Sequence, residues 1–149
     1  MAGYKQGYFK PKHPEKYKGR VADIVYRSSL ELKVLMYLDN HPQVVRYASE
    51  ESFMIVSYVN PITGRSHRYF PDIWFERKDA SGKILTFLVE IKPHSQTLPP
   101  PKDKNGKISK KYLRMAATYG INMKKWEAAR VSCDKKGWIF KLISERHIN

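Results

Sequence analysis

The chain has 149 residues, of which 42% are hydrophobic and 13% aromatic, so it fits one globular domain with its own core and is not an intrinsically disordered chain. Lysine and arginine total 28 against 14 acidic residues, and the net charge of +14 favours a polyanionic partner, nucleic acid before an anionic membrane surface. The one cysteine, Cys133, excludes an internal disulfide and a multi-cysteine zinc site and fits a reducing compartment.

Residues 1–20 are predicted to form a basic, aromatic N-terminal arm ahead of a domain at residues 21–149. Recurring glycines and prolines deny the arm a regular helix, and no apolar stretch follows its basic residues, so no signal peptide is expected. Lysines interleaved with tyrosines suit a nucleic-acid backbone and exposed bases, which makes Lys5, Lys10 and Lys12 candidate DNA contacts. A tail that packs its tyrosines on the body is an equally good interpretation.

Residues 27–40 are predicted to form the first helix. Ser28 or Ser29 offers an N-cap, and the spacing of Ser28 and Glu31 fits a capping box. The apolar stripe of this helix consists of Leu30, Val34, Leu35 and Leu38. Glu31 therefore has two interpretations, because it can cap the helix or, at the edge of the buried face, reach a site at the sheet.

Strands are predicted next. A short candidate at residues 44–47 is followed by stronger ones at 53–59, 66–75 and 84–91, which are separated by turn sequences. Pro71 is expected to form a bulge or a break. The last three strands are expected to form a meander.

The rest of the chain is predicted to hold a loop, a helix and a last strand at residues 137–143. Residues 94–107 contain three consecutive prolines, which indicates a loop that acts as a flap or a mobile connection. Residues 108–130 have a helical pattern that can break at Gly120. No apolar run approaches the ~20 residues of a membrane span. The core-facing residues of the helix are expected to be Trp126 and Ala129, with Met115 and Met123 as further candidates.

The strongest chemical signal lies on two of the strands. Side chains alternate along a strand, so Glu90 and Lys92 lie on one side and Ile91 on the other. If the preceding strand pairs with this one as a hairpin, Asp72 comes to lie beside Glu90. Two carboxylates and a lysine suit a divalent cation, while the lysine orients a water or stabilises charge on a phosphate. A solvated strand face is the simpler interpretation of Glu-x-Lys alone.

The sequence resembles the PD-(D/E)xK nuclease superfamily in three features: an acid on a helix, an acid after a proline, and Glu-x-Lys on a strand. The form Glu-x-Lys-Pro is most similar to the TnsA-like endonuclease branch of that superfamily. The string at residues 1–19, together with Tyr26-Arg27-Ser28-Ser29, resembles the head completion nucleases of T-even-type tailed phages. The resemblance implies an α/β fold with a restriction-endonuclease-like core, in which helices flank a mixed β-sheet, and it makes residues 21–149 the nuclease domain.

The resemblance also implies roles for the catalytic set, which consists of Glu31, Asp72, Glu90 and Lys92. Asp72 and Glu90 would ligate Mg²⁺, for which Mn²⁺ could substitute, and the backbone carbonyl of Ile91 would add an oxygen. Glu31 would ligate a second metal or hold a metal-bound water, and Lys92 would position the attacking water. The reaction would be hydrolysis of double-stranded DNA, which trims or cuts packaged DNA before heads and tails join. The expected partners are head and portal vertex proteins, without a membrane, in the host cytoplasm during assembly or in the virion.

Further candidates for DNA contact each have a simpler interpretation. Arg27 flanks Glu31, yet an exposed helix face explains it as well. His67 lies on a strand, where a lone histidine is usually a surface residue. Loop polarity explains Gln96, and a solvated helix face explains Lys124 and Lys125.

Two other functions compete with the nuclease. A structural DNA-binding head-completion protein that does not require catalysis would explain the charge, but it has no need for Glu90 and Lys92 at the end of a buried strand. A ribonuclease or RNA-binding module is compatible with the charge, yet the sequence carries no RNA-binding signature.

Overall fold

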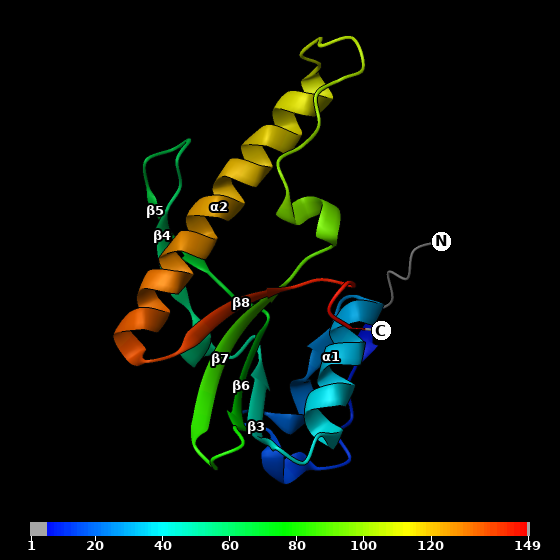
Figure 1. Ribbon diagram of the computed structural model, residues 1–149, viewed down its shortest axis with the longest axis vertical. Helices are drawn as coiled ribbons and strands as arrows, with labels where there is room; N and C mark the ends of the chain where they lie inside the picture. Colours follow the sequence, from blue (N-terminus) through cyan, green and yellow to red (C-terminus); the bar gives the residue numbers. More distant parts are fainter. Residues whose placement is uncertain (1–5, 149) are drawn as a thin grey trace.

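The computed structural model describes residues 6–148 and has a four-stranded mixed sheet at its centre. Strands β3 (Val44–Ser49), β6 (Ile73–Lys78), β7 (Ile84–Ile91) and β8 (Ile139–Ile143) are adjacent in that order (Figure 1). The first two pairings are antiparallel, whereas β8 is parallel to β7 because the long helix α2 (Lys110–Lys136) forms the crossover between them. The predicted α/β class with a mixed sheet is confirmed.

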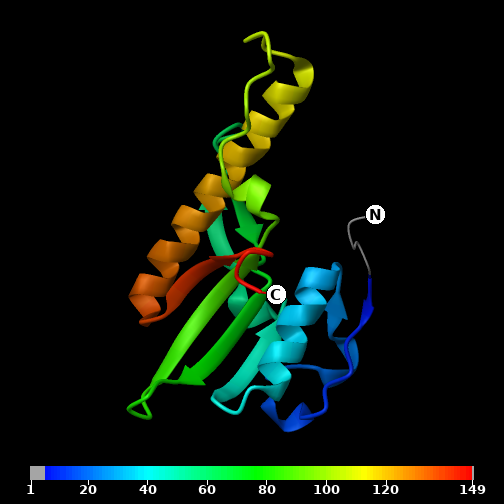
Figure 2. The same ribbon diagram turned by 45° about the vertical axis from the view of Figure 1, so that its right-hand side comes forward.

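Helices α1 (Ser29–Asn40) and α2 cover opposite faces of this sheet (Figures 1 and 2). Phe87 of β7 faces α1, so its neighbour Leu88 faces the other way. Leu88 pairs in register with Phe140 of β8, and the guanidinium of Arg130 on α2 lies 5.5 Å from the centre of the Phe140 ring. Helix α2 therefore packs on the second face.

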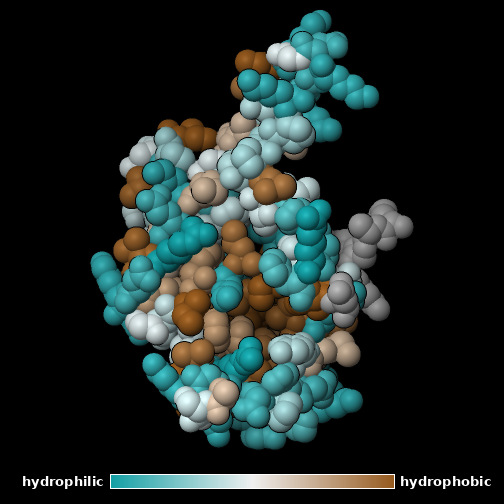
Figure 3. Space-filling model, viewed as in Figure 1, coloured by the Kyte–Doolittle hydropathy of each residue, from teal (hydrophilic) through white to brown (hydrophobic). Residues whose placement is uncertain are grey.

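The face beside α1 is not completely filled. A hollow of about 460 Å³ lies between α1 and the sheet, and in Figure 3 apolar side chains gather in a depression over the middle of this face. The rings of Phe75 and Phe87 stack in its floor with their centres 4.8 Å apart. Val34 and Leu38 of α1 form one wall, and Ile143 of β8 contributes to the lining.

The predicted first helix is confirmed. Helix α1 starts at Ser29, and the Ser28 hydroxyl caps it by accepting a 3.1 Å hydrogen bond from the Glu31 N–H. Val34, Leu35 and Leu38 are buried as the apolar stripe requires.

The predicted meander is wrong. Residues 66–75 break after Tyr69, as Pro71 suggested, but the two halves join different sheets: β5 (Ser66–Tyr69) pairs with β4 (Val56–Val59), and β6 pairs with β3. The strand expected at 53–59 begins only at Val56, since Ser52–Met54 forms a tight 3-10 turn that buries Met54. The β4–β5 hairpin leaves the main sheet and packs against α2, as Figure 1 shows.

Helix α2 is longer than predicted and does not break at Gly120. Trp126 and Ala129 are buried as expected, but Met115 and Met123 are 42% and 41% exposed, so their predicted core position is wrong. The N-terminal half of α2 extends past the main sheet in Figures 1 and 2. No helix within residues 6–148 is both long and apolar enough to cross a membrane.

The segments on both sides of α2 have a defined local structure. Before α2, the predicted loop contains one 3-10 turn, His94–Thr97. Gly137 ends α2 with φ +73°, the left-handed conformation that glycine adopts without a steric penalty. The last strand therefore starts at Ile139 rather than at residue 137.

The N-terminal segment lies against the body from residue 7 onward. Strand β1 (Gly7–Tyr8) pairs with β2 (Val25–Tyr26), and Phe9 and Tyr17 are buried. The Tyr17 hydroxyl donates a 2.6 Å hydrogen bond to Glu51. Of the two interpretations of the arm, packing on the body therefore describes its structure.

Candidate active site

The start of β6 and the end of β7 bring Asp72 beside Glu90. The β6–β7 register pairs Ile73 with Val89, so the next facing residues are Asp72 and Glu90. The Asp72 N–H donates to the Val89 carbonyl at 3.1 Å, and the Asp72 carboxylate accepts a 2.7 Å hydrogen bond from the Ile91 N–H. The predicted hairpin pairing of these two segments is confirmed.

Lys92 lies on the same side of β7 as Glu90. Its Nζ atom is 3.7 Å from Oε2 of Glu90, and the Glu90 side chain is 7% exposed. The Lys92 N–H donates to the Ile143 carbonyl of β8 at 3.0 Å, which fixes the backbone just before Pro93. A carboxylate and an ammonium group are thus held together at the end of a buried strand.

Glu31 makes its hydrogen bond at the start of the helix, and it lies within electrostatic reach of the sheet carboxylates. It lies in the capped first turn of α1, and its carboxylate accepts a 3.0 Å hydrogen bond from the Arg27 N–H. Burial raises the pKa of Glu31, the Arg27 hydrogen bond opposes this shift, and the charges of Glu50 and Glu90 add to it. Its charge therefore acts on the β6–β7 carboxylates as well as on the helix terminus.

The carboxylates of this site carry more negative charge than the protein neutralises. Burial is the largest cause that raises the pKa of Asp72 well above its usual range, followed by the charge of Glu90; Glu31 contributes further. The Ile91 N–H bond acts in the opposite direction. Such a group binds protons, or a metal cation in place of protons, more strongly than an isolated aspartate does.

Glu50 also belongs to this acidic site, and the sequence analysis missed it. It follows β3 with φ +52°, its N–H donates to the Asp72 carbonyl at 3.2 Å, and its carboxylate forms an ion pair with Arg27. Because β3 runs antiparallel to β6, a residue just after β3 lies beside one just before β6. The pairing of these two strands was the signal that could have found it.

The donors fit a hard divalent cation, because they are oxygens and their charge is not balanced. Within residues 6–148, however, no three His, Cys, Asp or Glu side chains converge as a ready metal-binding group. Asp72 and Glu90 form a pair, and Glu31 contributes charge without completing a three-carboxylate cluster in this structure.

Three of the candidate DNA contacts lie near this site. Arg27 is paired with Glu50. The Lys125 ammonium lies 5.7 Å from the centre of the Tyr69 ring. Burial, followed by the charge of Glu90, raises the pKa of the Tyr69 hydroxyl. Gln96 lies in the 3-10 turn that follows Lys92 and Pro93.

The other candidates lie elsewhere. The Lys12 N–H donates a hydrogen bond to the carboxylate of Asp39. Asp39 lies near the C-terminal end of α1, whereas Glu31 lies near its start. The Lys10 side chain is exposed on the same N-terminal segment as Lys12. His67 lies against the Tyr58 ring on the β4–β5 hairpin, and Lys124 is 3.7 Å from Glu127. Lys5 lies outside the described residues.

Comparison with known proteins shows the family to which the chain belongs. Residues 41–145 match the family model described as TnsA-like endonuclease N terminal. The chain belongs to this TnsA-like family. It is also 34% identical, over 93% of its length and 90% of the relative's, to a protein of Enterobacteria phage T4 named head completion nuclease. Both resemblances drawn from the sequence are confirmed.

The matched part of this TnsA-like chain contains the main sheet and α2. Asp72, Glu90 and Lys92 fall inside the matched residues, whereas α1 with Glu31 and the N-terminal segment precede them. The relative from phage T4 matches over nearly the whole chain, so the similarity extends beyond the sheet. Family membership is consistent with the expected restriction-endonuclease-like fold.

Proposed function

We propose that this protein is a metal-dependent DNA nuclease of phage head completion, which trims or cuts packaged double-stranded DNA before heads and tails join. The observation that carries the proposal is the meeting of Asp72 and Glu90 across the β6–β7 pair, with the Lys92 ammonium 3.7 Å from Glu90. Family membership and the name of the T4 relative support a nuclease, and that name supports the role in head completion.

Asp72, Glu90 and the carbonyl of Ile91 would hold Mg²⁺, or Mn²⁺ in its place. Glu31 would hold a second metal or a water. A divalent cation bound here supplies a lower pKa for its water and neutralises charge that develops on the phosphate. The environment of Asp72 in the free protein supports this assignment, because its carboxylate faces Glu90, and burial, followed by the charge of Glu90, raises its pKa well above the usual range.

Side chains of the protein would position the water and bind the DNA. Lys92 would orient the attacking water through its ammonium group, and Glu90 would hold that ammonium in place. Arg27 and Lys125 would bind phosphates on either side of the carboxylates. The water oxygen forms a new bond to phosphorus while the opposite phosphorus–oxygen ester bond breaks, which is in-line displacement at a phosphodiester.

The location of the activity follows from the same proposal. The protein would act in the host cytoplasm while virions assemble, or inside the virion, together with proteins of the head and portal vertex. The competing structural role predicts full assembly activity and salt-sensitive DNA binding without any need for the carboxylate pair.

The test is cleavage of supercoiled and linear duplex DNA with Mg²⁺, with EDTA, and by the Lys92→Ala variant. We expect cleavage that requires the metal and falls about 10²–10³-fold in Lys92→Ala. Lys83→Ala, at the far turn of the β6–β7 hairpin, is the matched control and should cleave like the wild type. No cleavage by the folded wild type, despite DNA binding, would overturn the nuclease and favour the structural role.

A further inference from the structure

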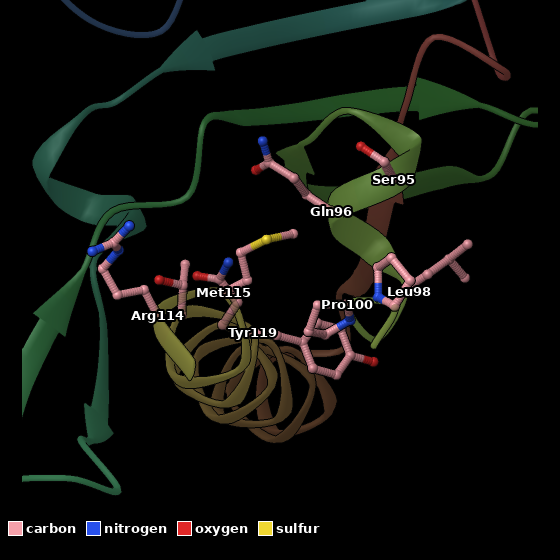
Figure 4. A pocket seen from close by; sticks show the side chains of 10 residues that line it. Ser95, Gln96, Leu98, Pro100, Arg114, Met115 and Tyr119 are labelled. Atoms are coloured by element: carbon pink, nitrogen blue, oxygen red, sulfur yellow. The ribbon is translucent and has the colours of Figure 1, made fainter. Parts of the chain in front are cut away.

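A cavity of about 560 Å³ lies beside the carboxylate site, between the segment that follows Lys92 and the N-terminal half of α2. In Figure 4, Met115 and Tyr119 reach up from α2 while Gln96 lies on the turn opposite, and Pro100 lies next to the Tyr119 ring. The size is within the range of small-ligand sites. Its walls are the flat, rigid rings of a proline and a tyrosine.

One polar side chain in the wall of the cavity has no partner in the protein. Asn122 is 8% exposed and lines the cavity, and its amide forms no hydrogen bond with any residue between 6 and 148. The amide atoms are not among the fully buried polar atoms, so a group bound in the cavity can pair with them. The amide of Gln96 lies on the other side of the cavity, so donors and acceptors are available on both sides of a bound group.

The charge around the cavity selects the kind of ligand. Residues 98–114 contain six cationic side chains and one acid, Asp103, and none of them forms an ion pair within residues 6–148. The six cations are all exposed: Lys102, Lys104, Lys107, Lys110, Lys111 and Arg114. Arg114 lines the cavity, and the other five cations lie on the adjoining loop and the first turn of α2. A largely apolar cavity with these cations nearby suits a polyanion that carries flat rings, rather than an apolar peptide segment.

Two segments that line the cavity are close in sequence to residues of the carboxylate site. The Gln96 N–H donates to the Pro93 carbonyl at 2.9 Å, and Pro93 directly follows Lys92. On α2, Lys125 is three residues beyond Asn122, about one helical turn along the axis, and it lies over the Tyr69 ring beside Glu90. A strand whose phosphate is at the carboxylates can therefore place a neighbouring base in the cavity.

We propose that this cavity binds one unpaired nucleobase of the DNA, stacked on Tyr119 and hydrogen-bonded by Asn122. The preferred substrate is then a duplex with a short single-stranded extension next to the scissile phosphodiester. The inference rests on the proposed nuclease function and adds the form of its substrate. A base inside a duplex cannot enter such a cavity without being unpaired.

The test is equilibrium binding in EDTA, so that no measurement depends on cleavage. Three DNA hairpins are compared by fluorescence anisotropy: one with a blunt end, one with a three-nucleotide extension, and one whose extension carries abasic sites. We expect the wild type to bind the extension about tenfold more tightly than the blunt end, and the abasic sites to abolish this difference. Equal affinity for the three DNAs would overturn the proposal.

Variants of residues that line the cavity test whether the preference for the extension depends on the cavity. Tyr119→Phe should keep the preference for the extension, whereas Tyr119→Ala should lose it without weakening blunt-end binding. Thr118→Trp fills the cavity from an exposed position and should lose the preference without disturbing the fold. Leu113→Ala, on the same stretch of α2 but outside the cavity, is the matched control and should behave like the wild type.

The two proposals fail in different ways. A wild type that prefers the extension but does not cleave DNA with Mg²⁺ would refute the nuclease and leave the base-binding cavity. A wild type that cleaves, but whose preference for the extension survives in Thr118→Trp, would refute the cavity and leave the nuclease.

Discussion

Asp72 and Glu90 face each other at the boundary of β6 and β7, and within residues 6–148 the one cation at ion-pair distance from either of them is Lys92. The folded protein therefore holds the Asp72 proton to a higher pH than the unfolded chain does. Between the two pKa values the folded state binds more protons, so the stability contributed by Asp72 falls as the pH rises through this window. The candidate site therefore lowers the stability of the folded protein at neutral and alkaline pH.

Removing this charge should stabilise the metal-free protein. We expect Asp72→Asn to raise the free energy of unfolding in EDTA at pH 8 by about 0.5–2 kcal/mol, since Asn can still accept the Ile91 N–H bond without repelling Glu90. The gain should shrink as the pH falls and Asp72 becomes protonated. Urea denaturation at pH 8 and at pH 5 measures both effects.

Asp79 supplies the control for this experiment. It lies in the turn between β6 and β7, where hydrogen bonds from Ser81 lower its pKa. Asp79→Asn should therefore give no gain in stability at pH 8. A loss of stability in Asp72→Asn at pH 8 would contradict the electrostatic description of the site.

Metal binding should show the same residue dependence. A cation that binds only the folded state raises its stability by mass action, so saturating Mg²⁺ should raise the melting temperature of the wild type by roughly 3–8 °C. Asp72→Asn should show no such rise, and Asp79→Asn should respond like the wild type. Equal shifts in all three proteins would mean that the metal binds elsewhere.

Helix α1 is held at both ends, which fixes Glu31 relative to the sheet. Ser28 caps its start, and at its end the Lys16 ammonium donates to the carbonyls of Leu38, Asp39 and His41 at 2.8, 2.9 and 3.0 Å. These three bonds satisfy carbonyls that a helix terminus leaves without partners. The N-terminal segment is therefore a structural clasp for α1.

Loss of this clasp should destabilise the protein. We expect Lys16→Met to lower the free energy of unfolding by about 1–3 kcal/mol, because partly buried carbonyls lose a charged donor. Lys12→Met is the matched control, since Lys12 contacts Asp39 through its backbone N–H and its side chain is exposed. Equal stability of the two variants in chemical denaturation would rule out the clasp.

The elements that sequence predicts well are those whose signal is local. The run of apolar residues from Ile84 to Ile91 coincides with β7, and the capping serine locates α1. The pairing of strands is not local, and the separation of the β4–β5 hairpin from the main sheet was missed because the element it packs against, α2, lies more than 50 residues away. Met115 was wrongly predicted to lie in the core, because the periodicity of apolar residues cannot show where a helix extends beyond the sheet that it packs on.

The candidate site follows the same rule. Asp72, Glu90 and Lys92 were identified because they border two recognisable strands, and one antiparallel pairing is enough to bring them together. Glu50 was missed because its place depends on β3 pairing with β6 across the intervening hairpin. Glu50 also has a left-handed backbone conformation, with φ +52°. Such a conformation is usually indicated by a glycine or an asparagine at that position, and here the residue is a glutamate.

Across the whole molecule, a net charge of +14 surrounds the Asp72–Glu90 pair, whose negative charge is increased by the nearby Glu31. The basic surface favours a polyanion, and the proposed function places a cation at the acidic site, where that polyanion would react. The cations of residues 98–114 extend the basic surface beyond the sheet along α2.

DNA binding should therefore depend steeply on salt. Each phosphate contact contributes about −0.9 to the slope of log K against log salt concentration. Replacing Lys107, Lys110 and Lys111 together by Gln should make this slope shallower by roughly 2–3 in a binding titration. The triple control Lys78, Lys83 and Lys135 to Gln removes the same charge at other places on the surface. An unchanged slope in the first variant would exclude these lysines from the interface.

The central claim is that the Asp72–Glu90 pair is the hydrolytic site. The most direct test measures single-turnover DNA cleavage with Mg²⁺ and the free energy of unfolding on the same preparation of Asp72→Asn. We predict that cleavage falls at least about 10²–10³-fold while the metal-free protein becomes more stable than the wild type. Cleavage at the wild-type rate by this folded variant would contradict the claim.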